Sequence, residues 1–246
     1  MTPEYIELVK STVPILRENG VALTSYFYNR MLTNNPELKN IFNLDSQQSG
    51  RQPRALAAAV LAYAENIENP TVLARAIEHI ATKHVSLEIQ PEQYPIVGEN
   101  LLHSISEVLN VPFESELIAA WKAAYLQLAD SLISAEKTKN GGWAGWRNFN
   151  ITQIEQADAG QVFVLQAADE HAVLAAEAGQ FISVKVKVPN HNLEQPHQFV
   201  VVSGLDGQYQ FMVKGEENRT EYSVANILLE HYKVGDQVKV TAPLSK

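Results

Sequence analysis

The stretch Ile80-Ala-Thr-Lys-His-Val-Ser-Leu87 places a histidine near the end of a segment with helical periodicity, which closes before Pro91. Upstream, Phe42 stands in an irregular segment that follows the helix breaker Pro36. A lone histidine on a helix is more often a surface or core residue than a ligand. A late-helix histidine paired with an aromatic residue in an interhelical corner, however, has the layout of a haem pocket, where imidazole ligates the iron and the ring stacks on the porphyrin. His84 and Phe42 are therefore the first candidate site residues.

The first part of the chain has helical periodicity, as in the apolar series Val60, Tyr63 and Ile67. Breakers such as Asn34-Asn35-Pro36 and Val111-Pro112 separate the periodic runs. The pattern predicts helices at roughly 3–17, 20–34, 51–67, 71–86, 92–109 and 114–138. The segment 37–50, rich in Ser, Gln and Asn, is predicted to be shorter and irregular.

Near residue 140 the period of the pattern changes to two, as in the alternation of residues 181–188. The pattern predicts strands over 181–188, 197–203, 208–214 and 236–241, a turn at Gly204-Leu-Asp-Gly207 and a helix over 223–232. The sequence thus predicts a multi-domain α + β chain. An all-α domain spans 1–139, a hinge spans 140–150, and a small antiparallel β-barrel spans 151–246.

Composition excludes several functional classes. The 246 residues contain no cysteine, which excludes a disulfide framework, a thiolate zinc site, an iron–sulfur cluster and a cysteine nucleophile. The net charge of −9 disfavours nucleic acid as a partner, because phosphate binding needs clustered lysine and arginine. No apolar run approaches the ~18 residues of a membrane span, and the N-terminal MTPEYIELVK lacks a signal sequence. We therefore expect a soluble, cytoplasmic protein.

Residues 1–139 resemble the globin domain of bacterial flavohaemoglobins, because several blocks of that domain occur in family order and spacing. The blocks are residues 25–32 (SYFYNRML), 35–43 (NPELKNIFN), 62–69 (AYAENIEN), 80–87 (IATKHVSL), 89–102 (IQPEQYPIVGENLL) and 120–125 (AWKAAY). The resemblance implies a globin fold and haem b.

On the proximal side of the haem, the resemblance makes His84 the iron ligand, with Tyr94 and Glu136 as the two partners held behind it. A carboxylate and a phenol on the second imidazole nitrogen give the histidine imidazolate character, which favours O₂ activation over storage. Without the resemblance, Tyr94 could simply pack and Glu136 could be a solvated charge at the end of a helix.

On the distal side, the resemblance makes Tyr28 the phenol that donates a hydrogen bond to O₂. Gln52 and Leu56 match residues that face the ligand, and their spacing of four places them on one helical face. Lys83 matches a residue near the haem edge where electrons enter, although an isolated lysine is more often only solvated.

The barrel half resembles the start of a ferredoxin-reductase-type FAD domain, through residues 142–149 (GWAGWRNF), 178–184 (AGQFISV) and 234–243 (VGDQVKVTAP). The family's Arg-x-Tyr-Ser run, which holds the flavin, is replaced here by His197-Gln198-Phe199-Val200, and the resemblance makes His197, Gln198 and Phe199 the candidate cofactor-binding residues of the barrel. Its Gly-x-Val-Ser run is replaced by Tyr222-Ser223-Val224-Ala225, while Lys214 and Phe199 remain. The lost donors predict FAD binding weaker by about two to four orders of magnitude, so FAD is a doubtful cofactor.

The sequence ends at Ala242-Pro-Leu-Ser-Lys246 and contains no G-x-G-x-x-G run for a dinucleotide. Because the flavin motifs are altered as well, we expect a naturally shortened relative that lacks the NAD domain. The predicted function is haem-dependent O₂ binding and oxidation of nitric oxide to nitrate, with an external electron-donating reductase. The alternative is a haem-based O₂ or NO carrier or sensor without catalytic turnover.

Overall fold

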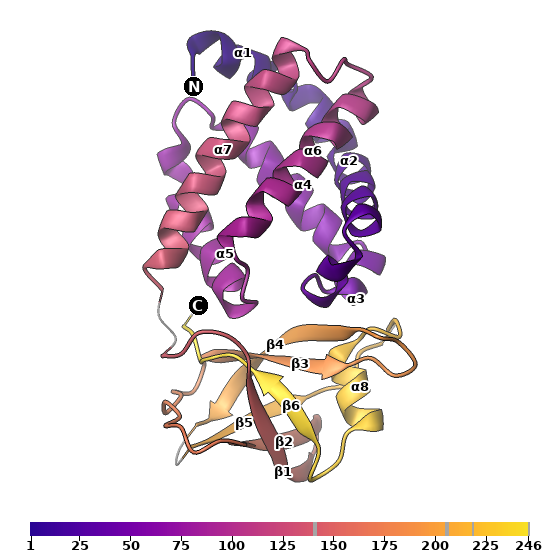
Figure 1. Ribbon diagram of the computed structural model, residues 1–246, viewed down its shortest axis with the longest axis vertical. Helices are drawn as coiled ribbons and strands as arrows, with labels where there is room; N and C mark the ends of the chain where they lie inside the picture. Colours follow the sequence, from indigo (N-terminus) through magenta and orange to yellow (C-terminus); the bar gives the residue numbers. More distant parts are fainter. Residues whose placement is uncertain (140–141, 205–206, 218, 246) are drawn as a thin grey trace. The chain divides into compact units, whose positions relative to one another are not determined.

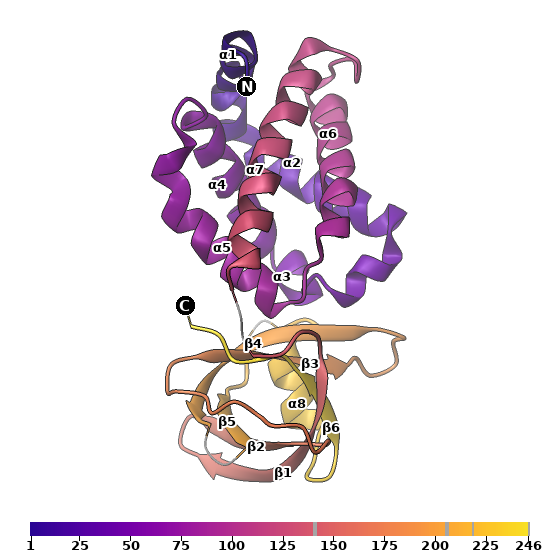
Figure 2. The same cartoon turned by 60° about the vertical axis from the view of Figure 1, so that its left-hand side comes forward.

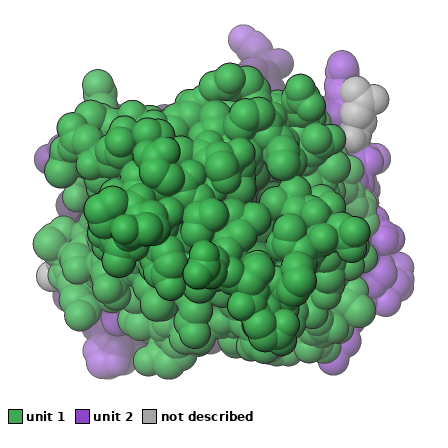
Figure 3. Space-filling view, turned by 90° about the horizontal axis from the view of Figure 1, so that it is seen from above, with its two compact units in different colours: residues 1–37, 46–81, 90–138 green, residues 38–45, 82–89, 139–246 purple. Residues whose placement is uncertain are grey.

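The computed structural model describes residues 1–139, 142–204, 207–217 and 219–245. The chain divides into two compact units, coloured separately in Figure 3. The first comprises Met1–Glu37, Ser46–Ala81 and Gln90–Thr138, and the second comprises Leu38–Asp45, Thr82–Ile89 and Lys139–Lys246. Two short segments of the predicted all-α domain therefore group with the barrel.

The part of the chain before residue 139 is helical, as predicted (Figures 1 and 2). The helices are α1 (Pro3–Ser11), α2 (Val13–Asn34), η1 (Pro36–Asn40), α3 (Leu44–Gln48), α4 (Arg51–Glu65), η2 (Pro70–Leu73), α5 (Ala74–Ser86), η3 (Pro91–Gln93), α6 (Tyr94–Leu109) and α7 (Glu116–Lys137). The segment predicted to be irregular contains the 3₁₀ helix η1 and the short helix α3, with Phe42 between them.

The sequence predicts a break between the first two helices at residues 17–20. In the structure the break lies at Thr12. Thr12 turns its hydroxyl back to the carbonyl of Val9 at 2.6 Å, which ends α1. Pro14 has no N–H to continue the α1 ladder but fits the first turn of α2. Gly20 lies within α2 because it faces α4, where a Cβ at this position would meet the Cβ of Ala57 at 3.4 Å.

The part of the second unit after residue 142 is a closed antiparallel barrel with strand order β1-β2-β5-β4-β3-β6 (Figure 1). The strands are β1 (Arg147–Ala157), β2 (Gly160–Ala167), β3 (Phe181–Lys187), β4 (Glu194–Ser203), β5 (Gln208–Val213) and β6 (Gln237–Val240), with the helix α8 (Val224–His231). Inward side chains such as Phe149, Phe163 and Phe211 are fully buried in one apolar core. The predicted α + β fold class, with its barrel, is confirmed.

The hinge predicted over 140–150 overlaps β1, which begins at Arg147 because this strand pairs with β6 from that residue onward. Residues 140–141 of that hinge, and residues 205–206 of the turn predicted at 204–207, lie outside the described residues.

Within the described residues, no helix combines the length and the apolar character needed to cross a membrane.

We expect Gly98→Ala to lower the free energy of unfolding by about 1–3 kcal/mol, because the new Cβ would lie 2.8 Å from Cδ1 of Tyr125, whose hydroxyl is tied to the carbonyl of Tyr94. Gly20→Ala is the matched control, since it also adds a methyl group inside a helix but meets only an ordinary contact. Urea unfolding followed by circular dichroism measures both variants. Equal stability of the two would contradict the packing described for α6.

Candidate functional site

Tyr28 on α2 is buried, with 6% of its surface exposed, and its hydroxyl meets polar side chains from two other helices. Burial raises the pKa of the Tyr28 phenol well above its usual value, and the side chains of Gln52 on α4 and Gln47 on α3 oppose that shift only in part. The phenol therefore stays protonated at physiological pH and can donate a hydrogen bond.

The geometry of α2 and α4 explains this cluster. Gly50 adopts a left-handed φ of 72° directly before α4, and Thr24 of α2 donates a hydrogen bond to the carbonyl of Pro53 at 2.7 Å. These contacts hold the first turn of α4 against α2. Gln52 and Leu56, both half-buried, lie on consecutive turns of α4, as their spacing predicts.

Gln47 is a further residue of this cluster that the sequence does not predict. Its Nε2 is buried and makes no hydrogen bond of good geometry, although the side chain lies against Tyr28. A buried amide without an acceptor carries an energetic cost, so it marks a place where a polar ligand atom would be stabilised. The only sequence signal was the polar run Asp45-Ser-Gln-Gln-Ser49, in which nothing distinguishes one glutamine from the other.

Tyr94 and Glu136, predicted as the two partners of His84, lie together in the first unit. Tyr94 is buried at the start of α6, and its hydroxyl donates a hydrogen bond to Oε1 of Glu136 near the end of α7. Tyr125 of α7 donates to the carbonyl of Tyr94 at 2.6 Å and fixes the same turn. Burial is the main cause that raises the pKa of the Tyr94 phenol, and the hydrogen bond to Glu136 raises it further. The phenol thus remains a donor that holds the carboxylate in one place.

Phe42, Lys83 and His84 all lie in the second unit. His84 is in the last turn of α5, and its carbonyl accepts from the backbone N–H groups of Leu87 and Ile89 at 3.0 Å each. The side chains of Phe42 and His84 are half-buried, whereas Lys83 is exposed. The end of α5 is therefore well defined around His84.

The three residues predicted to contact flavin lie on β4, but their side chains have other partners. Phe199 is in the barrel core, with its ring centroid 4.7 Å from that of Phe211 and 4.8 Å from that of His197. Gln198 donates its Nε2–H to Oγ of Ser86. Val200, at the position of the family's serine, is 49% exposed and offers no hydrogen bond. Phe199 is therefore not presented for stacking on a flavin.

The second altered motif lies at the start of α8, where Ser223 is the N-cap. Ser223 donates to Oε2 of Glu216 at 2.7 Å, and Asn226 accepts from the backbone N–H of Glu216 at 3.0 Å. The positive end of this helix thus already faces a carboxylate of the same chain. A cavity of about 310 Å³ beside it is lined by further carboxylates, Glu221 and Glu230, together with Arg219, which pairs with Glu230. This donor set does not fit a dinucleotide phosphate.

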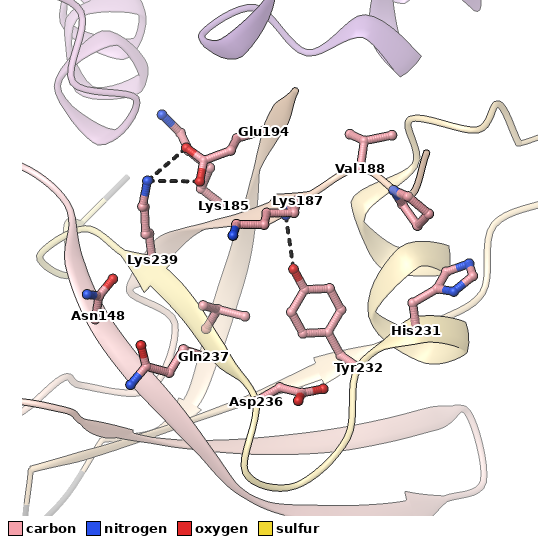
Figure 4. Close-up of a pocket in the computed structure, with 12 residues that line it drawn as sticks. Asn148, Lys185, Lys187, Val188, Glu194, His231, Tyr232, Asp236, Gln237 and Lys239 are labelled. Atoms are coloured by element: carbon pink, nitrogen blue, oxygen red, sulfur yellow. Dashed lines mark hydrogen bonds and ion pairs between the residues drawn. The ribbon is translucent and has the colours of Figure 1, made fainter. Parts of the chain in front are cut away.

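A larger cavity of about 700 Å³ lies on the barrel (Figure 4), and none of the predicted site residues lines it. Lys239 forms an ion pair with Glu194 at 2.8 Å, and Lys185 lies over the ring of Trp146 at 4.2 Å. Glu194 and Glu88 attract the Lys185 ammonium, while burial lowers its pKa. Because acidic groups balance these lysines, the cavity has no marked excess of positive charge.

Comparison with known proteins identifies the family of the first part of the chain. The family model for globins matches residues 25–132. A bacterial globin from Campylobacter jejuni is 43% identical and superposes with a TM-score of 0.53, covering 56% of this chain and 97% of that one. The chain belongs to the globin family. The helical arrangement around Tyr28 and Tyr94 is thus a globin fold.

Matches to longer proteins extend across the barrel. The flavohemoprotein of Bordetella pertussis is 45% identical over 253 residues, which cover 99% of this globin chain and 63% of the relative. The flavohemoglobin of Malassezia yamatoensis, determined with bound FAD and heme, has a TM-score of 0.89 at 25% identity, covering 100% of this chain and 64% of that one. The predicted resemblance to flavohaemoglobins is confirmed. The chain spans about 63% of the length of the curated relative.

We expect the buried tyrosines of this globin to ionise late. Burial raises the pKa of Tyr28, Tyr94, Tyr125 and Tyr209, so the stability that they contribute is fully present below the unfolded pKa of about 10 and is lost as the pH rises above it. A pH titration of the native protein, followed by the ultraviolet absorbance of tyrosinate, should show a delayed phase of ionisation at high pH that is absent in urea.

Tyr28→Phe should remove the equivalent of about one tyrosine from the delayed phase and none from the early phase. Ionisation of all nine tyrosines together near the ordinary pKa in the native protein would contradict the burial described here.

Proposed function

We propose that this globin binds haem b through His84, with Phe42 against the porphyrin, and that it oxidises nitric oxide to nitrate with O₂. The observation that carries the proposal is the hydrogen bond from Tyr94 to Glu136, in a globin whose relatives include proteins named flavohemoproteins. Bound haem supplies an iron centre that binds diatomic gases and changes oxidation state.

The residues of the distal side fit such a group. Tyr28 is a buried, protonated donor, and Gln47 has a buried amide without an acceptor. Both are suited to a small, partly anionic ligand such as O₂, which accepts hydrogen bonds. Gln52 orients the phenol, and Leu56 contributes apolar surface that limits water in the pocket. Lys83, which is exposed, is proposed to lie near the haem edge.

The pair behind the proximal histidine fits activation better than storage. Tyr94 donates to Oε1 of Glu136, and the two oxygens of a carboxylate can together accept several hydrogen bonds. We assign that capacity to the imidazole N–H of His84. A histidine whose N–H is held by a carboxylate is a stronger electron donor to a metal, as second-shell partners generally make it.

Oxidation of nitric oxide to nitrate by O₂ consumes one electron per turnover (NO + O₂ + e⁻ → NO₃⁻). The donor set on β4 and at the start of α8 does not suit a flavin, since Phe199 is inside the core and Glu216 lies at the helix terminus. We therefore assign the electron supply to a separate reductase.

The poor fit of the barrel's donor set to a flavin also favours a second candidate function, in which the protein binds O₂ or NO as a carrier or sensor without turnover. The two functions differ in a measurable way. With excess O₂ and a supplied flavin reductase, a dioxygenase consumes many equivalents of nitric oxide and forms equal nitrate, whereas a carrier consumes about one.

The cofactor content is tested by absorption spectroscopy of the purified protein. We expect a Soret band in the wild type, loss of most haem in His84→Ala, and no flavin in the supernatant after denaturation. His79→Ala, on the exposed side of the same helix, is the matched control and should keep its haem. A wild type without a Soret band would overturn the haem site, and stoichiometric flavin would overturn the separate reductase.

The distal donor is tested with Tyr28→Phe in the haem-loaded protein. A hydrogen bond to a partly charged ligand contributes ~1.5–3 kcal/mol, so O₂ release should accelerate roughly 10- to 150-fold, with slower nitric oxide oxidation. Tyr26→Phe, on the same helix but bonded at the surface to Glu107, should leave the release rate unchanged. Stopped-flow measurement of O₂ release decides the matter, and equal rates in both variants would remove Tyr28 from the site.

A further inference from the structure

The side chain of Gln195 on β4 is completely buried, and its hydrogen-bond partners are the corner segment Leu38–Asp45 and the carbonyl of the preceding residue, Glu194. Its Oε1 accepts from the backbone N–H of Leu44 at 2.7 Å, and its Nε2 donates to the carbonyl of Lys39 at 2.6 Å. The carbonyl of Phe42 lies 3.4 Å from the same Nε2. One amide of the barrel thus bonds to the backbone on both sides of Phe42.

Gln198, three residues farther along β4, reaches the end of α5. Its Nε2 donates to Oγ of Ser86, and Ser86 in turn donates to the carbonyl of Lys83 at 2.7 Å. Ser86 is buried, with 1% of its surface exposed. This relay ends on the residue directly before His84.

Three further contacts tie the same corner segment to the barrel. Asn40 accepts from the backbone N–H of Glu194 at 2.8 Å, and Asn43 donates to the carbonyl of Pro196 at 2.9 Å. Asp45 accepts from the hydroxyl of Thr220 at 2.8 Å. These contacts hold the corner segment against the first half of β4 and against Thr220. Together with the bond from Gln198 to Ser86, they explain why Leu38–Asp45 and Thr82–Ile89 group with the barrel.

We propose that Gln195 and Gln198 are positioning residues of the haem site, through which β4 fixes the segments that carry Phe42 and His84. The inference rests on the proposed haem function. Its physical basis is that the last carbonyls of a helix lack intrahelical partners, so the last turn is the easiest part to move. The Gln198–Ser86–Lys83 relay restrains that turn in α5 and, with it, the direction of the His84 side chain.

The proposal gives the barrel a role that needs no flavin. A small change in the direction of an imidazole alters its bond to a metal, and outer partners that set ligand orientation commonly change affinity by 10- to 100-fold. Gln195 likewise restrains the position of the Phe42 ring, because it bonds to the backbone on both sides of that residue.

The first measurement is hydrogen exchange in the full chain without haem, comparing Gln195→Leu, Gln198→Leu and the control Gln237→Leu. Gln237 is an exposed barrel glutamine whose amide bonds to Asn150. We expect at least about tenfold faster exchange of the Leu44 amide in Gln195→Leu. Gln198→Leu should have the same effect on the amides of Leu87 and Ile89, and Gln237→Leu should affect neither segment.

The second measurement uses the haem-loaded chain. Gln198→Leu should shift the iron–histidine stretching frequency and release haem about tenfold faster, and Gln195→Leu should release haem faster. Gln237→Leu should match the wild type. If Gln195→Leu does not fold, Gln198→Leu, at a half-buried position, carries the test alone.

The outcomes separate the two proposals. Faster exchange in the variants of a chain that takes up no haem would support fixation of the segments by β4 and refute the haem function. A haem-loaded chain in which the exchange and the iron–histidine frequency of Gln198→Leu equal those of the control would refute the positioning role and leave the haem function intact.

Discussion

The hydrogen bonds of the buried Gln195 amide constrain the whole second unit. An amide removed from water must find partners in the protein, since an unsatisfied buried donor or acceptor costs roughly 1–3 kcal/mol. Here the partners are backbone groups of Lys39 and Leu44, more than 150 positions earlier in the chain. The second unit therefore includes a corner of the globin fold as well as the barrel, and that corner is the one that carries Phe42.

This constraint explains which parts of the fold were predictable. The helices and strands follow from local periodicity, because an apolar stripe must be buried wherever it occurs. The break was predicted at residues 17–20 and lies at Thr12, because it depends on the Thr12 hydroxyl and on Pro14, whereas Gly20, which has no side chain, allows α2 to approach Ala57 on α4. The grouping of Leu38–Asp45 with the barrel has no periodic signal, since it depends on side-chain hydrogen bonds between residues that are distant in sequence.

The candidate site shows the same limit. The pairing of Tyr94 with Glu136 was accessible only through resemblance to a family, because no spacing rule links the start of α6 to the end of α7. Gln47 was missed, since its burial against Tyr28 depends on how α3 packs. Gln198 was assigned to flavin from its place in a motif, but its side chain bonds to Ser86. A motif predicts a position on the strand, and the direction and partners of each side chain are set by packing.

The hydrogen-bond partners of these side chains distinguish two roles that a flavin domain can combine, which are the supply of electrons and the positioning of the globin segments. Electron supply requires a cradle for the dinucleotide, and here Glu216 occupies the helix terminus and Phe199 lies within the core. Positioning requires only that β4 present buried amides to the globin segments, which Gln195 and Gln198 do. The second role does not depend on the first, because none of its hydrogen bonds involves a flavin-contact position other than Gln198 itself. A barrel in which Phe199 and Glu216 already have partners inside the chain can therefore still determine how the corner and the end of α5 are held.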